Sequence, residues 1–318
     1  MVGDQLYIVD CGSGIGRQVE KAGLLGSNGR NDLRHLRAVF ITHLHSDHVA
    51  GFSSLLLEAT AAGGFGRPDR PVRIFGPGRR GALPDTFPPG RPAPTEIAPD
   101  LPFPGTEDMV GLLMAAFATD LNDRTFDTGV PSPALTVRSR DIALPPGCDL
   151  SPGNGESLMV PPFKVYEDGL VRVSATLVDH GQMFPAFAFR FDTDDGSVTF
   201  SGDTTVSENL IALAEGSDVL VHEVLDRGWV EESIAQLQVS PETKEAYLNH
   251  MLGAHTHTQQ VGLVAEGAGA ATLVLNHFVP ANLPDEKWLG AGENYGGRLI
   301  VARDLQVVGI GRGSGLGA

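Results

Sequence analysis

The sequence predicts an α/β fold, because short apolar strands alternate with amphipathic helices along much of the chain. A length of 318 residues suits one large domain or two small ones and is enough to bury a full core. The composition is that of a globular protein, with 42% hydrophobic and 19% charged residues. Forty glycines and 22 prolines indicate that much of the chain forms turns and loops.

The first quarter of the chain is expected to contain three strands and two helices. We predict a strand at 5–10, then a Gly-rich turn that fits a dinucleotide-binding loop poorly, and a short helix at 17–22. A buried strand follows at 38–42, since an apolar run there ends in a polar cluster. Helical spacing of apolar residues predicts a helix at 49–62, and the next apolar run predicts a strand at 72–75.

The middle of the chain has little periodicity. Half of the 22 prolines lie at 68–104, and 130–162 again has the composition of a loop. Between these stretches, an acidic helix start at 106 leads into a very apolar helix at 109–121. We therefore predict one domain over 1–318 that contains an insertion at 76–169.

The last part of the chain returns to regular alternation. A strand is predicted at 171–178, and strands at 186–191 and 198–201 form a hairpin around the turn sequence Thr-Asp-Asp-Gly. The remaining predicted elements are a helix at 209–214, a strand at 219–222, a helix at 258–268, a strand at 272–275 and a closing hairpin of 298–301 with 307–310.

A histidine-rich loop carries the clearest chemical signal. Three of the ten histidines, His43, His45 and His48, fall within six residues together with Asp47, directly after the predicted strand at 38–42. A tight loop at a strand end can direct neighbouring imidazoles and a carboxylate toward one point. Imidazole and carboxylate donors without thiolates suit Zn²⁺ best, with Mn²⁺ or Fe²⁺ as alternatives.

This loop resembles the signature motif of the metallo-β-lactamase fold superfamily, and later motifs resemble its ribonuclease Z and arylsulfatase-like branch. The resemblance rests on six motifs in order over 5–75 and 165–312: His43-x-His45-x-Asp47-His48, Leu177-Val-Asp-His180, Ser201-Gly-Asp203-Thr204, Val221-His222-Glu223, Ala254-His255-Thr-His257-Thr and Asn276-His277-Phe278. It implies a four-layer αββα sandwich with the Pro-rich insertion at the mouth of the active site.

The resemblance also implies a binuclear zinc centre with seven protein ligands. The first metal would be held by His43, His45 and His180, and the second by Asp47, His48 and His277. Asp203 would bridge the two ions. Two such dications can lower the pKa of a water molecule between them and supply hydroxide at neutral pH.

The candidate catalytic residues are Asp47, His255 and Glu223. In the resembling branch, the residue at position 255 contacts the substrate and the glutamate at 223 supports it. A carboxylate beside an imidazole holds one tautomer and allows proton donation to a departing oxygen. The competing interpretation of His255 is a polar loop residue near the metals. His222 and His257 are interpreted as structural or solvated.

Two cysteines, Cys11 and Cys148, cannot form a disulfide framework or a four-cysteine zinc site. Cys11 lies in an Asp-Cys-Gly turn that is typical of the family, where packing explains it. Cys148 lies in a Pro-Gly loop and carries no expected role.

The expected function is binuclear zinc-dependent hydrolysis of a small ester-like or activated aromatic substrate: a sulfate ester, a phosphodiester, a lactone or an aryl halide. A ribonuclease Z-type endonuclease for transfer-RNA precursors is the first alternative, and a metal-binding sensor without turnover is the second. The apolar helix at 109–121 suits a lid over a small substrate, a homodimer surface or an ordinary core helix.

The partner prediction follows from charge. With 39 acidic and 23 basic residues, the formal net charge is −16, and the arginines of the insertion are interleaved with acids. Nucleic acid is therefore not an expected partner, since phosphate binding is driven by Lys and Arg. No apolar stretch is long enough for a membrane span, and we expect a cytoplasmic protein. Because family members carry a strand hairpin before position 5, a trimmed start that removed a signal peptide is an alternative.

Overall fold

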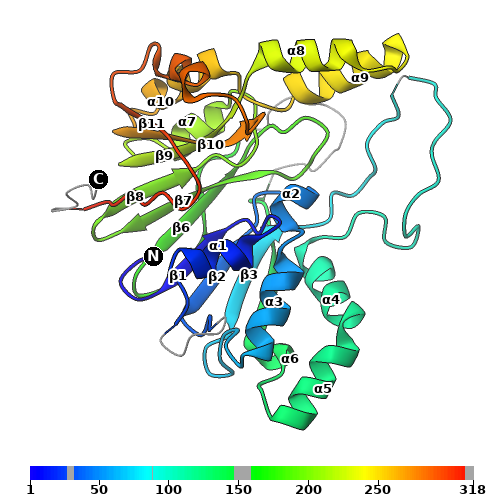
Figure 1. Cartoon of the computed structure of the whole chain (residues 1–318), viewed down its shortest axis with the longest axis vertical. Helices are drawn as coiled ribbons and strands as arrows, with labels where there is room; N and C mark the ends of the chain where they lie inside the picture. Colours follow the sequence, from blue (N-terminus) through cyan, green and yellow to red (C-terminus); the bar gives the residue numbers. More distant parts are fainter. Residues whose placement is uncertain (27–31, 88, 147–158, 312–318) are drawn as a thin grey trace. The chain divides into compact units, whose positions relative to one another are not determined.

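The computed structural model describes residues 1–26, 32–87, 89–146 and 159–311. They form two compact units, each with its own sheet (Figure 1). The first unit comprises Met1–Arg79 and Pro104–Ala143, and the second comprises Arg80–Phe103 and Leu144–Ala318.

The first unit is built on a four-stranded parallel sheet in the order β1-β2-β3-β4. Its strands are β1 (Leu6–Val9), β2 (Leu36–Phe40), β3 (Val72–Pro77) and β4 (Val137–Ile142). Buried residues of one sheet face form a core with α1 (Ile15–Lys21) and α3 (Phe52–Ala61). The predicted strands at 5–10, 38–42 and 72–75 are confirmed to within a few residues.

The helix predicted at 49–62 is divided. A short α2 (Ser46–Val49) ends before Gly51, and α3 begins at Phe52. A Cβ at Gly51 would lie 2.1 Å from the carbonyl oxygen of Gly12, so only glycine allows this approach of the two backbones. The approach ties the histidine-rich loop to the turn that follows β1.

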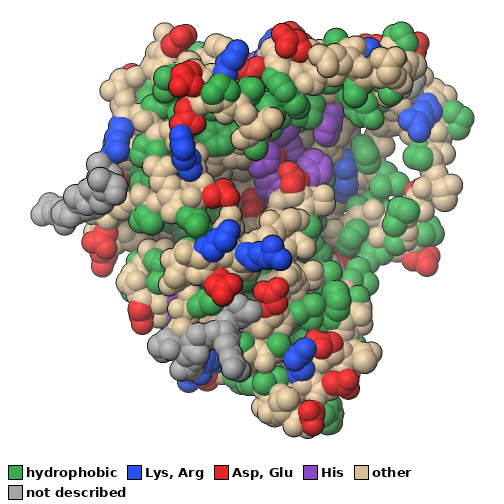
Figure 2. Space-filling view, viewed as in Figure 1, with side chains coloured by type: hydrophobic (Ala, Val, Ile, Leu, Met, Phe, Trp, Pro, Cys, Tyr) green, Lys and Arg blue, Asp and Glu red, His purple; other side chains and the backbone are tan. Residues whose placement is uncertain are grey.

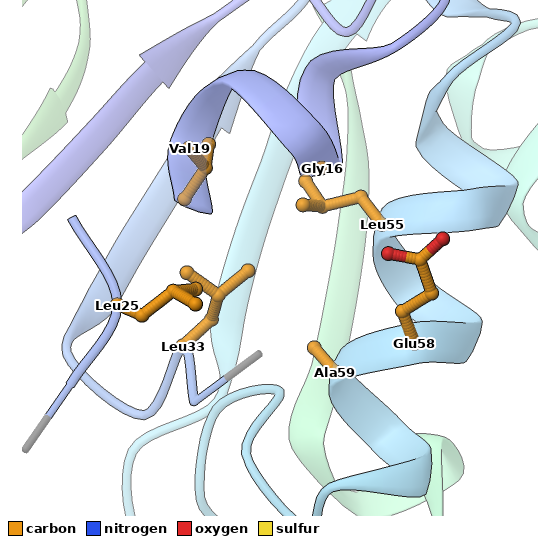
Figure 3. A pocket seen from close by; sticks show the side chains of 7 residues that line it. All are labelled: Gly16, Val19, Leu25, Leu33, Leu55, Glu58 and Ala59. Carbon is orange, nitrogen blue, oxygen red and sulfur yellow. The ribbon is translucent and has the colours of Figure 1, made fainter. Parts of the chain in front are cut away.

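A small pocket remains between α1 and α3 (Figure 3). Its only charged lining residue is Glu58, which accepts a hydrogen bond from Ser54 Oγ at 2.9 Å. A Cβ at Gly16 would come within 2.9 Å of a Glu58 oxygen, so Gly16 allows α1 to approach α3 closely. The lining residues are Gly16, Val19, Leu25, Leu33, Leu55, Glu58 and Ala59.

The stretch after the Pro-rich segment contains more regular structure than predicted. The expected single helix at 109–121 is two helices, α4 (Thr106–Ala116) and α5 (Ala118–Thr128), with Phe117 at the break. The loop expected at 130–162 contains α6 (Pro133–Thr136) and β4. Apolar periodicity could not reveal β4, because it is an edge strand whose four central residues, Arg-Ser-Arg-Asp, are all polar.

The second unit contains a seven-stranded mixed sheet in the order β11-β10-β9-β8-β7-β6-β5. The predicted hairpin is confirmed, since β7 and β8 pair antiparallel around its turn. The strands are β5 (Phe163–Glu167), β6 (Arg172–Leu177), β7 (Phe187–Thr193), β8 (Gly196–Phe200), β9 (Val219–Leu225), β10 (Thr272–Val279) and β11 (Arg298–Val301).

Helices α7 (Glu208–Leu213) and α10 (Thr258–Gly267) pack on β9 and β10 around a second core. Helices α8 (Arg227–Gln236) and α9 (Pro241–Leu252) lie side by side (Figure 1). Two short 3₁₀ turns, η1 (Asp285–Lys287) and η2 (Leu289–Gly292), precede β11.

Three parts of this unit differ from the sequence prediction. Strand β5 and helices α8 and α9 were not predicted; α9 has no fully buried residue, and its apolar residues Leu248, Met251 and Leu252 are only partly buried. The prediction of a closing hairpin is wrong, because β11 pairs parallel with β10 and residues 307–310 are not in a strand.

Every helix within the described ranges is too short or too polar to cross a bilayer. Residues 104–143 pack within the first unit, and β5 extends the second sheet. A single domain over 1–318 with a lid at 76–169 stays a prediction, and Cys148 lies outside the described residues.

Candidate metal centre

The first unit gathers four of the predicted ligands at the carboxyl end of β2. His43 follows the strand, and His45 precedes α2, which carries Asp47 and His48. His43 Nε2 lies 3.1 Å from His45 Nδ1, and the His43 and His48 ring centroids are 4.0 Å apart. Asp47 Oδ2 lies 3.5 Å from His48 Nε2, and the Asp47 side chain is 60% exposed. The loop therefore brings three imidazoles and one accessible carboxylate together.

Asp10 orients this loop. One of its carboxylate oxygens accepts from the backbone N–H of Thr42 at 2.7 Å. The other accepts from the Thr42 hydroxyl and from His48 Nδ1, both at 2.8 Å. Because Nδ1 of His48 is engaged by a carboxylate, Nε2 is the nitrogen available to a metal.

The second unit brings together the other three predicted ligands, with His180 and His277 on Asp203. His180 Nε2 lies 3.8 Å from Asp203 Oδ2, and His277 Nε2 lies 3.5 Å from the same oxygen. Asp203 is 3% exposed and follows β8, while His180 follows β6. The Ala254 carbonyl accepts from His180 Nδ1 at 2.8 Å, so Nε2 of His180 is directed toward Asp203.

His277 is placed by an irregularity in β10. Its φ is +43°, and the pairing register with β9 shifts between Asn276 and Phe278. A bulge of this kind redirects a side chain out of the regular strand alternation. The histidine therefore lies beside Asp203.

The predicted Glu223–His255 pair is present in the second unit. His255 Nδ1 lies 3.0 and 3.1 Å from the two Glu223 carboxylate oxygens. Glu223 is 1% exposed and also accepts from the backbone N–H groups of Thr204 and Thr256. The pair fixes the His255 ring so that Nε2 points away from the carboxylate.

Burial and pairing act in opposite directions on these two groups. Burial raises the pKa of Glu223, and its hydrogen bond with His255 opposes this. Burial alone would lower the pKa of His255, but the hydrogen bond with Glu223 and the charge of that carboxylate outweigh it, so the pKa of His255 is raised. An imidazolium is thus retained to higher pH than in a free histidine.

Both donor sets fit metal binding by their chemistry. All donors are imidazole nitrogens and carboxylate oxygens, which suit Zn²⁺, Mn²⁺ and Fe²⁺. In the second unit, His180, Asp203 and His255 can offer ligand atoms within 4.8 Å of one another. His48 and His180 each have one nitrogen held by a carboxylate or a carbonyl, as metal-binding histidines usually do.

The other histidines and the cysteine singled out in the sequence lie at buried or helix-capping positions. His222 is fully buried, its Nδ1 donates to the Glu223 carbonyl at 2.7 Å, and burial lowers its pKa to about 4. His257 precedes α10 at its N-cap. Cys11 is fully buried in the first core, where burial raises the pKa of its thiol.

Sequence reasoning missed Asp10, Thr42 and Ala254 as groups that orient the histidines. Asp10 was the detectable one, since an acidic residue ends a predicted strand in an Asp-Cys-Gly turn of the recognised family. The role of Ala254 is a backbone carbonyl contact, which no residue type signals.

The chain is similar to a known family and to known proteins over most of its length. The family described as "Metallo-beta-lactamase superfamily" matches residues 2–248. A ribonuclease Z of Mycobacterium bovis is 29% identical over 310 residues, covering 96% of this chain and 88% of the relative. A ribonuclease Z of Mycobacterium marinum is 26% identical over 319 residues, with the same two coverages.

Solved structures share the fold. The short form of human tRNase Z aligns with a TM-score of 0.57 at 18% identity, covering 98% of this chain and 90% of that one. The metallo-β-lactamase fold protein YhfI from Bacillus subtilis aligns with a TM-score of 0.53 at 17% identity, covering 96% and 87%. These similarities confirm the predicted metallo-β-lactamase-like α/β fold.

The partner prediction is corrected by these relatives. Nucleic acid was not expected, yet the curated relatives are ribonucleases by name, so that expectation is wrong. The net charge of −16 sums over the whole chain, whereas a substrate meets only a local surface. Acidic and basic side chains are interspersed on the face drawn in Figure 2.

The family match covers more than three quarters of the sequence, and the ribonuclease Z relatives align over nearly its whole length. The donor chemistry of both units agrees with that match, and a sensor without turnover is not supported. The chain belongs to the metallo-β-lactamase superfamily and is a metal-dependent hydrolase.

Proposed function

We propose that this chain is a ribonuclease Z-type endonuclease that hydrolyses a phosphodiester bond in precursor transfer RNA. The observation that carries the proposal is the similarity to curated ribonucleases Z over 96% of the chain. The Glu223–His255 pair supports it, because RNA cleavage requires a proton for a poor leaving oxygen.

Two Zn²⁺ ions serve this reaction in our proposal, with Mn²⁺ or Fe²⁺ as alternatives. As the family resemblance implies, the ligand groups are His43, His45 and His180 for one ion, Asp47, His48 and His277 for the other, and Asp203 for both. When bound, such ions lower the pKa of water and stabilise the negative charge that develops on phosphoryl oxygens.

His255 is the proposed general acid. Its Nδ1 is held by Glu223, so Nε2 donates a proton to the leaving oxygen of the RNA as the P–O bond breaks. Glu223 is a positioning residue, since it contacts His255 and two backbone N–H groups. Asp47 is the proposed catalytic carboxylate of the first unit, where its exposed side chain is accessible to solvent.

Cleavage of precursor transfer RNA tests the proposed function. We expect the full chain supplied with Zn²⁺ to cut a precursor with a 3′ extension near the mature 3′ end. A chelator should abolish the cleavage and added Zn²⁺ should restore it, because the ligands are the chain's own imidazoles and carboxylates. A mature transfer RNA is the control substrate. An enzyme with full metal content that leaves the precursor intact would disprove the proposal.

A Glu223→Gln variant is expected to move the alkaline limb of the pH–kcat profile to lower pH. As a general acid, His255 is active while protonated, so kcat falls as pH rises through its raised pKa. The amide removes the negative charge that raises this pKa, so the proton is lost at lower pH. Values of kcat measured from about pH 6 to 10, on protein with unchanged metal content, check this. If the alkaline limb does not move, Glu223 does not raise the pKa of the general acid.

A further inference from the structure

A concave site with three arginines lies on the first unit. It is a hollow of about 480 Å³ on β3 and β4, lined by Arg73, Arg138 and Arg140 together with Phe75, Ser139 and Glu107. All three arginine side chains are exposed. The lining therefore carries three cations and one carboxylate in a chain whose formal net charge is −16.

Strand register places the three arginines on one face of the sheet. Arg73 pairs in register with Arg138, and Phe75 pairs with Arg140. Val72 and Ile74, on either side of Arg73, are buried in the core formed with the helices. Because side chains alternate along a strand, the arginines project from the opposite face.

The arginines have no carboxylate partner among the described residues, although other arginines of the chain do. Arg67, Arg124 and Arg303 each form an ion pair with an aspartate at 2.7–3.0 Å. Arg138 Nη1 donates to the carbonyl oxygens of Ala134 and Val137, at 2.8 and 2.6 Å, which orients its guanidinium. Three such groups in one hollow suit an anion with several oxygens.

The hollow is separate from the ligand loop of the same unit. Arg73 is in register with Ala38 of β2. Arg140 is in register with Phe75, which is in turn in register with Phe40 of β2. The ligand loop begins farther along the chain, at His43. At about 3.3 Å per residue, the arginine positions lie roughly 10–16 Å before His43 along the strand direction. Phosphates of one strand in a duplex are about 3.4 Å apart along the axis, so this distance spans several nucleotides.

We propose that the hollow formed by Arg73, Arg138 and Arg140 binds a backbone phosphate of the RNA several nucleotides from the bond that is cleaved. This inference rests on the proposed function, since RNA is the ligand. The competing explanation is protection of an edge strand: β4 lies at the sheet edge, where charged side chains prevent pairing with other chains. That explanation predicts aggregation of variants and no effect on RNA.

Binding is tested with the full, metal-loaded chain carrying His255→Ala, so that precursor transfer RNA is not consumed. The test variant is Arg73→Gln/Arg138→Gln/Arg140→Gln. The matched control is Arg67→Gln/Arg124→Gln/Arg303→Gln, which changes the net charge equally at ion-paired sites. We expect the test variant to bind at least roughly tenfold more weakly, and its slope of log Kobs against log salt to fall by about 2 to 3. Equal affinity and slope in the two triple variants would overturn the inference.

Steady-state kinetics with His255 intact separate RNA binding from folding. The test variant should show a raised KM for precursor transfer RNA and unchanged hydrolysis of bis-p-nitrophenyl phosphate, which is too small to span both sites. Equal loss of both activities would assign the arginines to the fold and overturn the inference. If the Gln variant does not fold, the variant with lysine at the same three positions is used instead. Lysine keeps the charge but lacks the bidentate guanidinium, so we expect weaker RNA binding. An unchanged RNA affinity of the Lys variant would overturn the inference.

Inorganic phosphate distinguishes an RNA site from a small-anion site. Phosphate should compete with RNA for the wild-type hollow and should not affect RNA binding by the test variant. Phosphate binding that depends on the arginines, with RNA affinity independent of them, would overturn the RNA assignment. If the wild-type enzyme cleaves RNA normally and the test variant binds RNA as tightly as its control, this inference is refuted and the proposed function is not. A wild-type enzyme that neither binds nor cleaves RNA refutes the proposed function, and this inference with it.

Discussion

A His255→Ala variant is expected to retain its metals and to lose roughly 10²–10⁴-fold in kcat on precursor transfer RNA, the range for a positioned acid–base group. The imidazole is held by both oxygens of Glu223 at 3.0 and 3.1 Å, and the methyl group of alanine cannot donate the proton in its place. The RNA alkoxide is a poor leaving group without a proton. The loss should therefore appear in kcat and not only in KM.

The leaving group gives the discriminating measurement. With bis-p-nitrophenyl phosphate, whose leaving group departs without a proton, the effect of His255→Ala should shrink. His35→Ala is the control, because it removes an imidazole of the first unit that is not part of the pair with Glu223. Loss of metal from the His255→Ala protein would mean that His255 is a ligand, and an equal loss on both substrates would contradict the proton-donor role.

Replacing Asp203 with alanine should reduce activity by more than about 100-fold and release at least one metal ion. Even residues that only orient metal ligands are worth 10–100-fold in affinity or activity, so a direct ligand should exceed this. Asp203 is the buried carboxylate to which both His180 and His277 point their Nε2 atoms. Without it, the second unit loses the negative charge that would compensate bound dications.

Elemental analysis of dialysed protein, alongside kcat, measures this effect. Asp192→Ala is the control, since it removes a carboxylate from β7 of the same sheet, which pairs with Arg190 at 2.9 Å. Asp203→Asn should fall between wild type and Asp203→Ala, because the amide keeps one coordinating oxygen without the charge. Full metal content and normal turnover in Asp203→Ala would show that the metals are bridged by another group.

The residues that we propose as metal donors could be selected from the sequence for two reasons. His43, His45 and His48 are close in sequence, and a loop at a strand end needs little tertiary information to bring them together. His180, Asp203 and His277 are far apart along the chain, and the family resemblance selected them. The structure places those three side by side within the second unit.

Elements with a clear apolar period were also predictable, whereas those without one were not. Strands β7 and β8 were recognised from their alternation and turn residues. Strand β4 has polar residues at its four central positions and α9 has no fully buried residue, so neither shows a clear apolar pattern. No proline or glycine marks the break between α4 and α5 at Phe117, so the sequence did not indicate it.

The sequence by itself indicated the superfamily and the residues that we propose as metal donors and as the acid–base pair, since these depend on residue type and order. Tertiary structure decided which groups orient them: Asp10 holds His48, and the backbone at Ala254 holds His180. It also decided where charge is concentrated. The net charge of −16 pointed away from RNA, but the register of β3 and β4 gathers three arginines in one hollow of the first unit, where no carboxylate of the described residues pairs with them. Electrostatic recognition depends on the local field, and the net charge of a sequence does not say where its charges lie in the folded protein.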